Sequence, residues 1–174
     1  MKIVSRDQWF EVQNLSDGIR LIHEPYIRPF YRCNLWHIQG RDKDLLLDSG
    51  SGLVSLREQL PWLTDKPLLA VASHTHFDHI AGHHEFAERL VHPAEAEILA
   101  APDGANTLAT AFVGDEMFEA HPDCPLCYAE YRVKAAPATR RAPIQGGCRR
   151  RARVSTGRAS LVDASAPAQA CASS

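Results

Sequence analysis

Apolar and polar residues alternate over short stretches in the N-terminal third of the chain, which is the pattern of half-buried β-strands. Residues 9–24 predict two strands joined at Asp17-Gly18, because this dipeptide readily adopts the backbone of a tight hairpin turn. Residues 34–40 and 44–50 repeat the pattern around the polar stretch GRDKD. This part of the chain therefore predicts two successive β-hairpins.

The apolar spacing then changes. Residues 51–62 place leucines three and four residues apart, which predicts a helix that ends near Pro61. Residues 67–73, PLLAVAS, are almost entirely apolar, as in a strand that is buried on both faces of a sheet. A strand of this kind predicts a central position in the fold.

Strands and helices are predicted to alternate further along the chain. Residues 81–90 indicate a helix, residues 89–93 a brief strand, and residues 93–101 a second helix that starts with proline. Residues 102–137 lose this regularity, and we expect a long loop with short helical pieces, forming a flap over a site. Alternating strands and helices favour a layered α/β fold.

The composition divides the chain into two unequal parts. Residues 1–139 carry twelve Lys/Arg and twenty Asp/Glu, whereas residues 140–174 carry seven arginines and one aspartate. The second segment has eight alanines and only four large aliphatic residues, so it cannot bury enough apolar area to offset the entropy lost on ordering. We therefore predict a folded domain over residues 1–139, followed by a disordered or weakly structured Arg/Ala/Ser-rich tail.

Several classes of protein do not fit this chain. Its first residues lack the apolar segment of a signal peptide, and no apolar run is long enough to span a bilayer. Five scattered cysteines do not suggest a disulfide framework, so we expect a protein of the reducing cytoplasm. The acidic balance of the predicted domain disfavours a nucleic-acid partner. A small-molecule substrate is the expected partner.

Histidines are concentrated directly after the apolar strand. Six of the nine histidines lie within residues 74–92, and five of them fall in SHTHFDHIAGHH. In an extended backbone the rings of His74 and His76 can lie on the same side and hold one metal ion. Asp78 and His79 follow one step later and can serve a second ion beside the first.

This set of side chains suits metal-assisted hydrolysis. Imidazole and carboxylate ligands favour Zn²⁺, and also iron or manganese. Two ions roughly 3.5–4 Å apart can share a hydroxide and polarise the oxygen under attack. Asp78 is the candidate catalytic residue, because it would bind one ion and orient that hydroxide. Asp48, at the end of a neighbouring predicted strand, is placed to accept a hydrogen bond from a ligand imidazole.

The remaining histidines and cysteines give weaker signals. His83 and His84 are expected to be solvated or to support the ligands. A structural role is expected for the other histidines, which are His23, His37, His92 and His121. Cys124 and Cys127 have the C-x-x-C spacing of half a zinc site or of a redox pair, but no second pair lies nearby in sequence, so we expect an ordinary loop.

Residues 34–99 resemble the first half of the metallo-β-lactamase-fold hydrolases, and residues 1–33 fit the opening hairpins of that family. The resemblance is carried by NLWHIQGRDKDLLLDSGSGL, LLAVASHTHFDHIAGHHEF and LVHPAEAEIL, in which H-x-H-x-D-H is the most specific element. The details are most similar to the branch that contains metallo-β-lactamase-domain-containing protein 2, some of whose relatives cleave acyl-coenzyme A thioesters.

The resemblance implies a four-layer αββα sandwich with two zinc ions at one edge. It implies that His74 and His76 bind the first zinc, and that Asp78 and His79 bind the second. Asp48 corresponds to an aspartate at the end of a strand in the family.

The resemblance ends near Arg140. The second half of the family's fold supplies a third histidine for the first zinc, an aspartate between the ions and a final histidine. No histidine follows His121 in this sequence, and Asp163 is the only late carboxylate. We therefore expect only the first half of the sandwich, weakened metal binding, a truncated or frameshifted product, and an exposed sheet face that favours self-association.

Three functions are consistent with these features. The first is a zinc-dependent hydrolase in which a metal-activated hydroxide attacks a thioester, ester or lactam carbonyl. The second is a non-catalytic or weakly metal-binding fragment. The third is an iron-dependent sulfur dioxygenase of the same fold. Metal content, thioester turnover and oxygen uptake distinguish the three.

Overall fold

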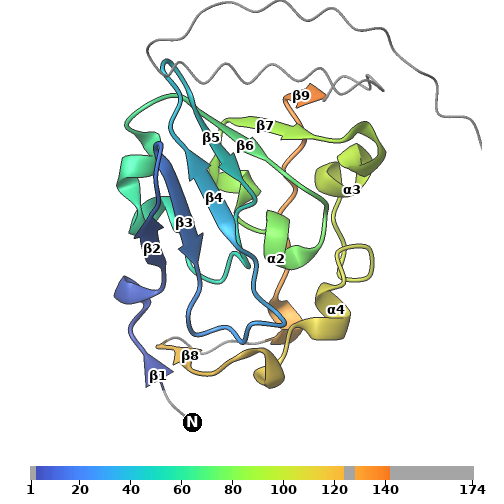
Figure 1. Cartoon of the computed structure of the whole chain (residues 1–174). Helices are drawn as coiled ribbons and strands as arrows, with labels where there is room; N and C mark the ends of the chain where they lie inside the picture. Colours follow the sequence, from blue (N-terminus) through green and yellow to red (C-terminus); the bar gives the residue numbers. More distant parts are fainter. Residues whose placement is uncertain (1–2, 124–127, 142–174) are drawn as a thin grey trace, which may run out of the picture. The chain divides into compact units, whose positions relative to one another are not determined.

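The computed structural model describes residues 3–123 and 128–141, and a mixed β-sheet dominates them (Figure 1). Its strand order is β2-β3-β4-β5-β6-β7-β9. The pairs from β2 to β5 are antiparallel, and β6, β7 and β9 extend the sheet in parallel. The strands are β2 (Glu11–Asn14), β3 (Ile19–His23), β4 (Leu35–Ile38), β5 (Asp44–Leu47), β6 (Leu68–Val71), β7 (Glu88–Val91) and β9 (Arg140–Arg141). A separate parallel pair joins β1 (Ile3–Val4) to β8 (His121–Pro122).

The first hairpin follows from its turn residues. Asp17 and Gly18 have positive φ angles of 58° and 74°, as a tight hairpin turn requires. Strands β2 and β3 consequently pair in a register that sets Val12 opposite Ile22. The second hairpin joins β4 to β5. Both hairpins predicted from the sequence are confirmed.

Short helical segments lie over one face of the sheet. They are α1 (Leu56–Gln59), the 3-10 helix η2 (Pro61–Thr64) and the 3-10 helix η3 (His83–Glu85). Burial of apolar area between these segments and the strands drives the two layers together. The buried residues of this first core are Ile22, Cys33, Leu35, Leu46, Leu56, Leu63, Leu68, Ala70 and Phe86.

A second apolar core begins where β6 and β7 end. It packs α2 (Phe77–Ile80), α3 (Ala96–Ala100) and α4 (Ala109–Phe112) against the loops that follow β3 and β5. Its fully buried large residues are Trp9, Ile27, Ile80, Leu99 and Met117. The segment after β6, which carries the histidine motif, is therefore anchored on buried apolar side chains.

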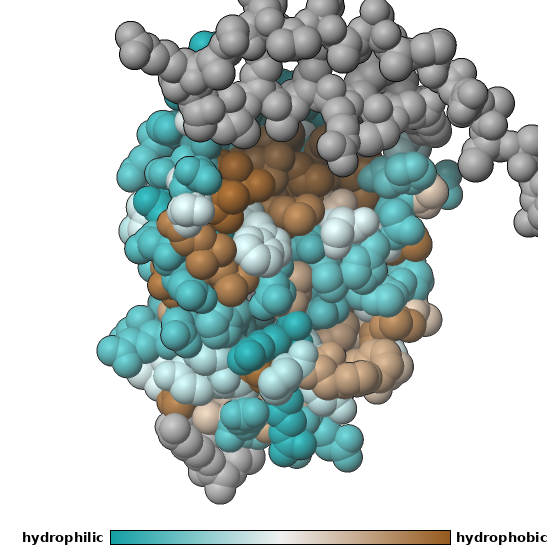
Figure 2. Space-filling view, in the orientation of Figure 1, coloured by the Kyte–Doolittle hydropathy of each residue, from teal (hydrophilic) through white to brown (hydrophobic). Residues whose placement is uncertain are grey.

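The opposite face of the sheet is apolar but only partly buried. The strand register places Leu21, Trp36, Leu47, Val71 and Leu90 in one row across the sheet. Each of these side chains is half-buried, and none belongs to either apolar core. Figure 2 shows the resulting apolar surface over the central strands. We call this surface the open sheet face.

The prediction that residues 67–73 form a strand buried on both faces is wrong for one face. Leu68 and Ala70 are buried in the first core, whereas Leu69 and Val71 on the other side are only half-buried. The reason is that neither apolar core of the described residues extends over the open sheet face.

Two predicted helices differ from the structure. The helix predicted over residues 51–62 is reduced to α1, because Gly52 has a positive φ of 67° and lies against Ala81, which a helical backbone would not permit. The helix predicted over residues 81–90 is wrong, because β7 begins at Glu88 and pairs with β6. Strand pairing here overrides the apolar spacing.

The α/β class is confirmed. The described residues supply one sheet with helices over one of its faces, which corresponds to half of the αββα sandwich. Residues 102–137 contain α4 and the 3-10 helices η5 (Asp115–Met117) and η6 (Tyr128–Glu130), as expected for a long loop with short helical pieces.

Strand β9 lies just beyond the domain boundary predicted at residue 139, and that boundary stays a prediction. The rest of the tail, including Asp163, lies outside the described residues. Within residues 3–123 and 128–141, no helix has both the length and the apolar character that crossing a bilayer requires.

Candidate metal centre

The histidine motif begins where β6 ends, at the carboxyl edge of the sheet. His74 and His76 lie in the extended segment before α2, and His76 is the residue that precedes the first turn of this helix. The ring centroids of His74 and His76 are 4.4 Å apart, and those of His74 and His79 are 3.9 Å apart. Asp78 Oδ2 lies 3.4 Å from His79 Nε2. The structure therefore places the four predicted metal ligands near one another, but among the described residues the group of three ligand atoms within 4.8 Å is that of Cys33, Asp48 and His79.

Asp48 anchors this group from the end of β5. Its φ of 62° is unusual for a residue other than glycine, and such backbones concentrate at functional sites. The carboxylate reaches across to the end of β6, where it accepts hydrogen bonds from the backbone N–H and the hydroxyl of Ser73, both at 2.8 Å. Asp48 Oδ2 also lies 2.8 Å from His79 Nδ1. The carboxylate thus fixes the orientation of the His79 ring.

Burial and hydrogen bonds set the charges of this pair. Burial alone would raise the pKa of Asp48, but the hydrogen bonds from His79 and Ser73 outweigh burial and lower the pKa. Burial alone would lower the pKa of His79, but the hydrogen bond to Asp48 and the charges of Asp78 and Asp48 raise it. Without a bound cation, the two groups stabilise each other as an ion pair.

The pKa of His74 shifts in the direction opposite to that of His79. Burial, and then the neighbouring rings of His79 and His76, lower the pKa of His74. A lowered pKa keeps the imidazole neutral at neutral pH, which is the form that binds metals.

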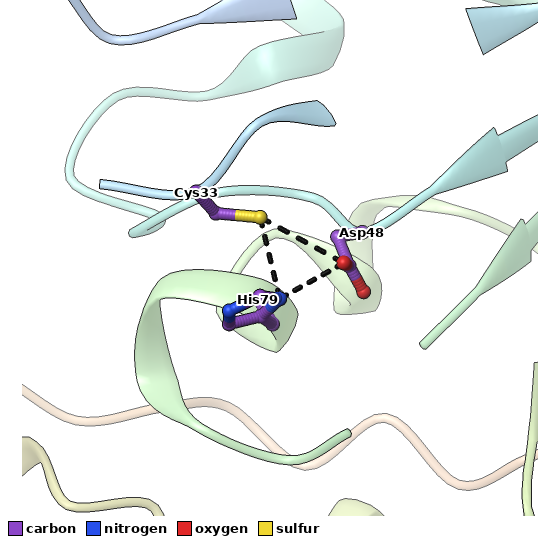
Figure 3. Close-up of side chains that lie close together, drawn as sticks. All are labelled: Cys33, Asp48 and His79. Carbon is purple, nitrogen blue, oxygen red and sulfur yellow. Dashed lines mark hydrogen bonds and ion pairs between the residues drawn. The ribbon is translucent and has the colours of Figure 1, made fainter. Parts of the chain in front are cut away.

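Cys33 is a buried neighbour that the sequence analysis does not identify. Its Sγ lies 3.3 Å from His79 Nδ1 and 3.7 Å from Asp48 Oδ2 (Figure 3). One ligand-type atom from each of these three residues lies within 4.8 Å of the other two, a spacing that can hold a cation. Cys33 sits outside any ligand motif, so only the pairing of strands brings it to this point.

We interpret the Cys33–Asp48–His79 group as a hydrogen-bond network. Burial, followed by the nearby carboxylates, raises the pKa of the Cys33 thiol, so the thiol stays protonated and can donate a hydrogen bond. The contact between Asp48 and His79 Nδ1 also has the length of an ordinary hydrogen bond. These groups occupy Nδ1 and leave Nε2 facing Asp78.

The remaining donors are of the chemical types that bind a divalent metal ion. His79 Nδ1 is engaged by Asp48, and His74 Nδ1 lies 3.1 Å from Ser73 Oγ. The groups left for coordination are the Nε2 edges of these rings, the ring of His76 and the carboxylate of Asp78. Imidazole nitrogen with one carboxylate is a donor set that suits zinc or iron, and the partner on Nδ1 is the usual way in which proteins orient such a ligand.

Residues behind the motif hold the loop in place. The carboxylate of Glu95 accepts hydrogen bonds from the backbone N–H and the hydroxyl of Thr75, which lies between the two ligand histidines. Ser49 N donates to the carbonyl oxygen of His79 at 2.7 Å, and Ser49 Oγ lies 2.6 Å from His83 Nδ1. His83 is fully buried, so it supports the loop instead of facing solvent.

The other histidines make local contacts. His37 pairs with Asp44 at 3.1 Å, and the Nδ1 atoms of His84 and His92 meet the backbone of their own segments. For His37 and His92 these contacts agree with the structural role expected from the sequence. Local contacts are also made by His23, which lies beside Glu11, and by His121, which lies beside Phe118 and Tyr128. The Cys124–Cys127 pair lies outside the described residues.

Comparison with known proteins supports the family that the motif suggests. The family model described as the metallo-beta-lactamase superfamily matches residues 28–138. The acyl-coenzyme A thioesterases MBLAC2 of Bos taurus and Homo sapiens are each 35% identical over 144 residues, covering 76% of this chain and 51% of the relative. The Gallus gallus protein of the same name is 40% identical over 101 residues, covering 53% and 36%. The chain thus spans about half the length of the curated relatives it matches.

Solved structures show a weaker likeness. The subclass B3 metallo-beta-lactamase MEM-A1 from a soil metagenome library has a TM-score of 0.44 and 18% identity, over 53% of this chain and 37% of that one. The MIM-2 metallo-beta-lactamase has a TM-score of 0.44 and 18% identity, over 57% and 39%. The family model covers well over half of this chain and includes the whole H-x-H-x-D-H motif. The chain belongs to the metallo-beta-lactamase superfamily.

Proposed function

We propose that this chain carries the metal-binding half of a zinc-dependent hydrolase that acts on acyl thioesters. One observation carries the proposal. His74, His76 and His79 lie ring against ring at the end of β6, Asp78 lies beside them, and His79 is held through its other nitrogen by Asp48. A group of imidazoles beside a carboxylate, with one ring oriented from behind, serves metal-assisted attack on a carbonyl.

The substrate class comes from the relatives. Three similar proteins bear the name acyl-coenzyme A thioesterase, and the chain covers only part of each. A thioester is therefore the favoured substrate, ahead of an ester or a lactam, which the same chemistry also cleaves.

The residues of the chain have separable roles in this reaction. When bound, a divalent ion lowers the pKa of a coordinated water to roughly 7 and polarises the carbonyl under attack. Asp78 accepts a hydrogen bond from the attacking water and so directs its lone pair at the carbonyl carbon. Asp48 keeps the His79 ring fixed during this attack. The water oxygen forms the new C–O bond, the C–S bond breaks, and the proton released by water ends on the thiol product.

Metal analysis of a matched pair of variants tests the proposal. We expect purified protein reconstituted with zinc to retain the metal after desalting, and His76→Ala to lose most of it, because His76 offers its ring to the ion. His92→Ala is the control, since His92 is an exposed histidine whose Nδ1 caps a neighbouring turn. Circular dichroism shows whether each variant is folded.

Three results would count against the proposal. Equal zinc in His76→Ala and the parent chain would remove His76 from the site. Zinc binding without turnover of an acyl-coenzyme A would favour a non-catalytic metal-binding fragment. Iron in the purified protein, with oxygen uptake on a persulfide substrate, would favour the sulfur dioxygenase alternative.

A further inference from the structure

An apolar pocket opens beside the candidate ligands His76 and Asp78. Its volume is about 280 Å³. Its walls come from three separate parts of the chain: the loop after β3, the start of α2 and the region of α4. The lining residues are Phe30, Tyr31, His76, Phe77, Asp78, Leu108 and Phe112. Apart from the two candidate ligands and the tyrosine hydroxyl, the side chains that line it are apolar.

Three aromatic rings form the outer wall of this pocket. The ring centroids of Phe30 and Tyr31 are 5.0 Å apart, and each lies 6.2 Å from that of Phe112. Phe30 is 78% exposed and Phe112 is 38% exposed. Figure 2 shows apolar surface over α4 on this side of the molecule. Clustered exposed apolar side chains next to a concave surface mark a binding site more often than a structural feature.

Backbone hydrogen bonds anchor the segments on both sides of the wall. The Arg28 N–H donates to the carbonyl oxygen of Met117 at 2.8 Å, and the Ile27 side chain beside it is fully buried. On the other side, the Phe77 N–H donates to the carbonyl oxygen of Thr107 at 2.9 Å. Leu108 follows with a positive φ of 60°, a strained backbone that orients its side chain toward the pocket. The pocket is therefore preformed, which reduces the entropy lost on binding.

A larger cavity of about 550 Å³ uses other residues of α4 and contains none of the candidate ligands. The smaller pocket is distinguished by its position. A chain that fills it continues directly to the side chains of His76 and Asp78. An occupant with an apolar tail and a reactive carbonyl at its end matches both the lining and the location.

We propose that this pocket holds the acyl chain of the substrate and that its volume limits the length of chain the protein accepts. The inference rests on the proposed function, because it takes the carbonyl to lie at the candidate metal ligands. It also assigns Phe30 and Phe112 as residues that determine chain-length specificity. The volume of the pocket lies just below the usual size range of small-molecule sites, so it suits short and medium acyl chains better than long ones.

Hydrolysis of acyl-coenzyme A thioesters from acetyl to palmitoyl tests this assignment. We expect kcat/KM to rise by roughly fourfold for each methylene that enters the pocket, and then to level off once the pocket is full. Phe30→Ala and Phe112→Ala should flatten this rise. Leu15→Ala is the control, because Leu15 is an exposed apolar residue at the hairpin turn, outside the pocket.

A binding measurement on metal-free protein separates this proposal from the proposed function. We expect decanoic acid, followed by isothermal titration calorimetry, to bind the parent chain, and Phe112→Ala to weaken binding roughly tenfold. Binding that depends on Phe112, in a protein without turnover, would support the pocket and contradict the hydrolase. Turnover without chain-length dependence, with unchanged binding in both variants, would overturn the pocket alone.

Two further outcomes would also overturn the proposal that the pocket holds the acyl chain. If Leu69→Ala weakens fatty-acid binding and Phe112→Ala does not, the fatty acid binds the open sheet face. If Phe30→Ala changes sedimentation but not fatty-acid binding, the aromatic wall is a contact between two copies of the chain.

Discussion

Single side chains at the end of β6 show how the site is oriented. His79 meets Asp48 through Nδ1, so that Nε2 is left toward Asp78. Replacing the network behind the ring would change the direction of the ligand without removing it. This division between an occupied and an open ring nitrogen is the feature on which the proposed metal centre depends.

His83 gives the residue-scale prediction for pH. Burial is the largest influence and lowers its pKa to about 4, and its Nε2 has no hydrogen-bond partner among the described residues. The unfolded chain, with an ordinary pKa of 6.5, therefore takes up a proton before the folded protein does. Stability should be complete above pH 6.5 and should fall by about 3 kcal/mol as the pH drops to about 4.

Urea unfolding as a function of pH measures this effect. His83→Asn keeps an amide group near the Ser49 hydroxyl but does not titrate in this range, so its unfolding free energy should depend less on pH. If the unfolding free energies of the parent chain and of His83→Asn depend on pH in the same way, His83 is not the group that causes the loss of stability.

The residue scale also shows what the sequence reveals about the site. The proximity of His74, His76, Asp78 and His79 is predictable because they share one short segment, and their role as metal ligands stays a prediction from that spacing. Cys33 is not predictable, since it reaches the site through the pairing of strands far apart in sequence. The same holds for the aromatic wall, because the loop after β3 and α4 meet only in the folded chain.

Short helical segments depend on contacts from neighbouring elements. Helix α1 has only one turn, and its backbone N–H groups at Leu56 and Arg57 donate to the carboxylate of Glu85 in η3. The Ser55 hydroxyl donates to the same carboxylate at 3.0 Å. A helix this short is unstable alone, so this cap from another segment decides where it begins.

The element-scale prediction concerns this cap. Glu85→Ala should lower the free energy of unfolding by about 1–2 kcal/mol, because it leaves the first N–H groups of α1 without their acceptor. Glu85→Gln keeps an acceptor oxygen but loses the favourable charge at the helix N-terminus. Its free energy of unfolding should therefore lie between those of Glu85→Ala and the parent chain. Urea titration measures the difference, with Glu97→Ala in α3 as an exposed control. Equal stability of Glu85→Ala and the parent chain would contradict the capping role.

Elements that depend on local turn chemistry are predictable, whereas the pairing of distant strands decides where other elements begin and end. The Asp17-Gly18 hairpin follows from the conformational preference of two residues. The helix predicted over residues 81–90 fails because β7 gains more from pairing with β6 than a helix would gain from its apolar spacing. Close packing of Gly82 against Ser49 also fixes the chain before β7.

At the scale of the whole molecule, the open sheet face is a half-buried apolar surface of the strands. Self-association through this face stays a prediction, and it follows from the half-buried row that includes Leu47, Val71 and Leu90. We expect sedimentation velocity to show association that increases with protein concentration. Leu69→Glu, on the same face, should raise the dissociation constant at least roughly tenfold.

Leu15→Glu is the matched control for this prediction, since Leu15 is equally apolar but lies at the hairpin turn. Circular dichroism must show that both variants are folded. A monomeric parent chain at all concentrations, or equal association of both variants, would rule out the open sheet face as the contact.

Anomalous diffraction from crystals soaked in zinc, recorded at the zinc absorption edge, tests the central claim most directly. The account predicts a peak on the Nε2 side of His79, within roughly 2.0–2.2 Å of donor atoms of His74, His76 or Asp78. A map without a peak beside these residues, or with its peak on the Nδ1 side between Cys33 and Asp48, would contradict the account.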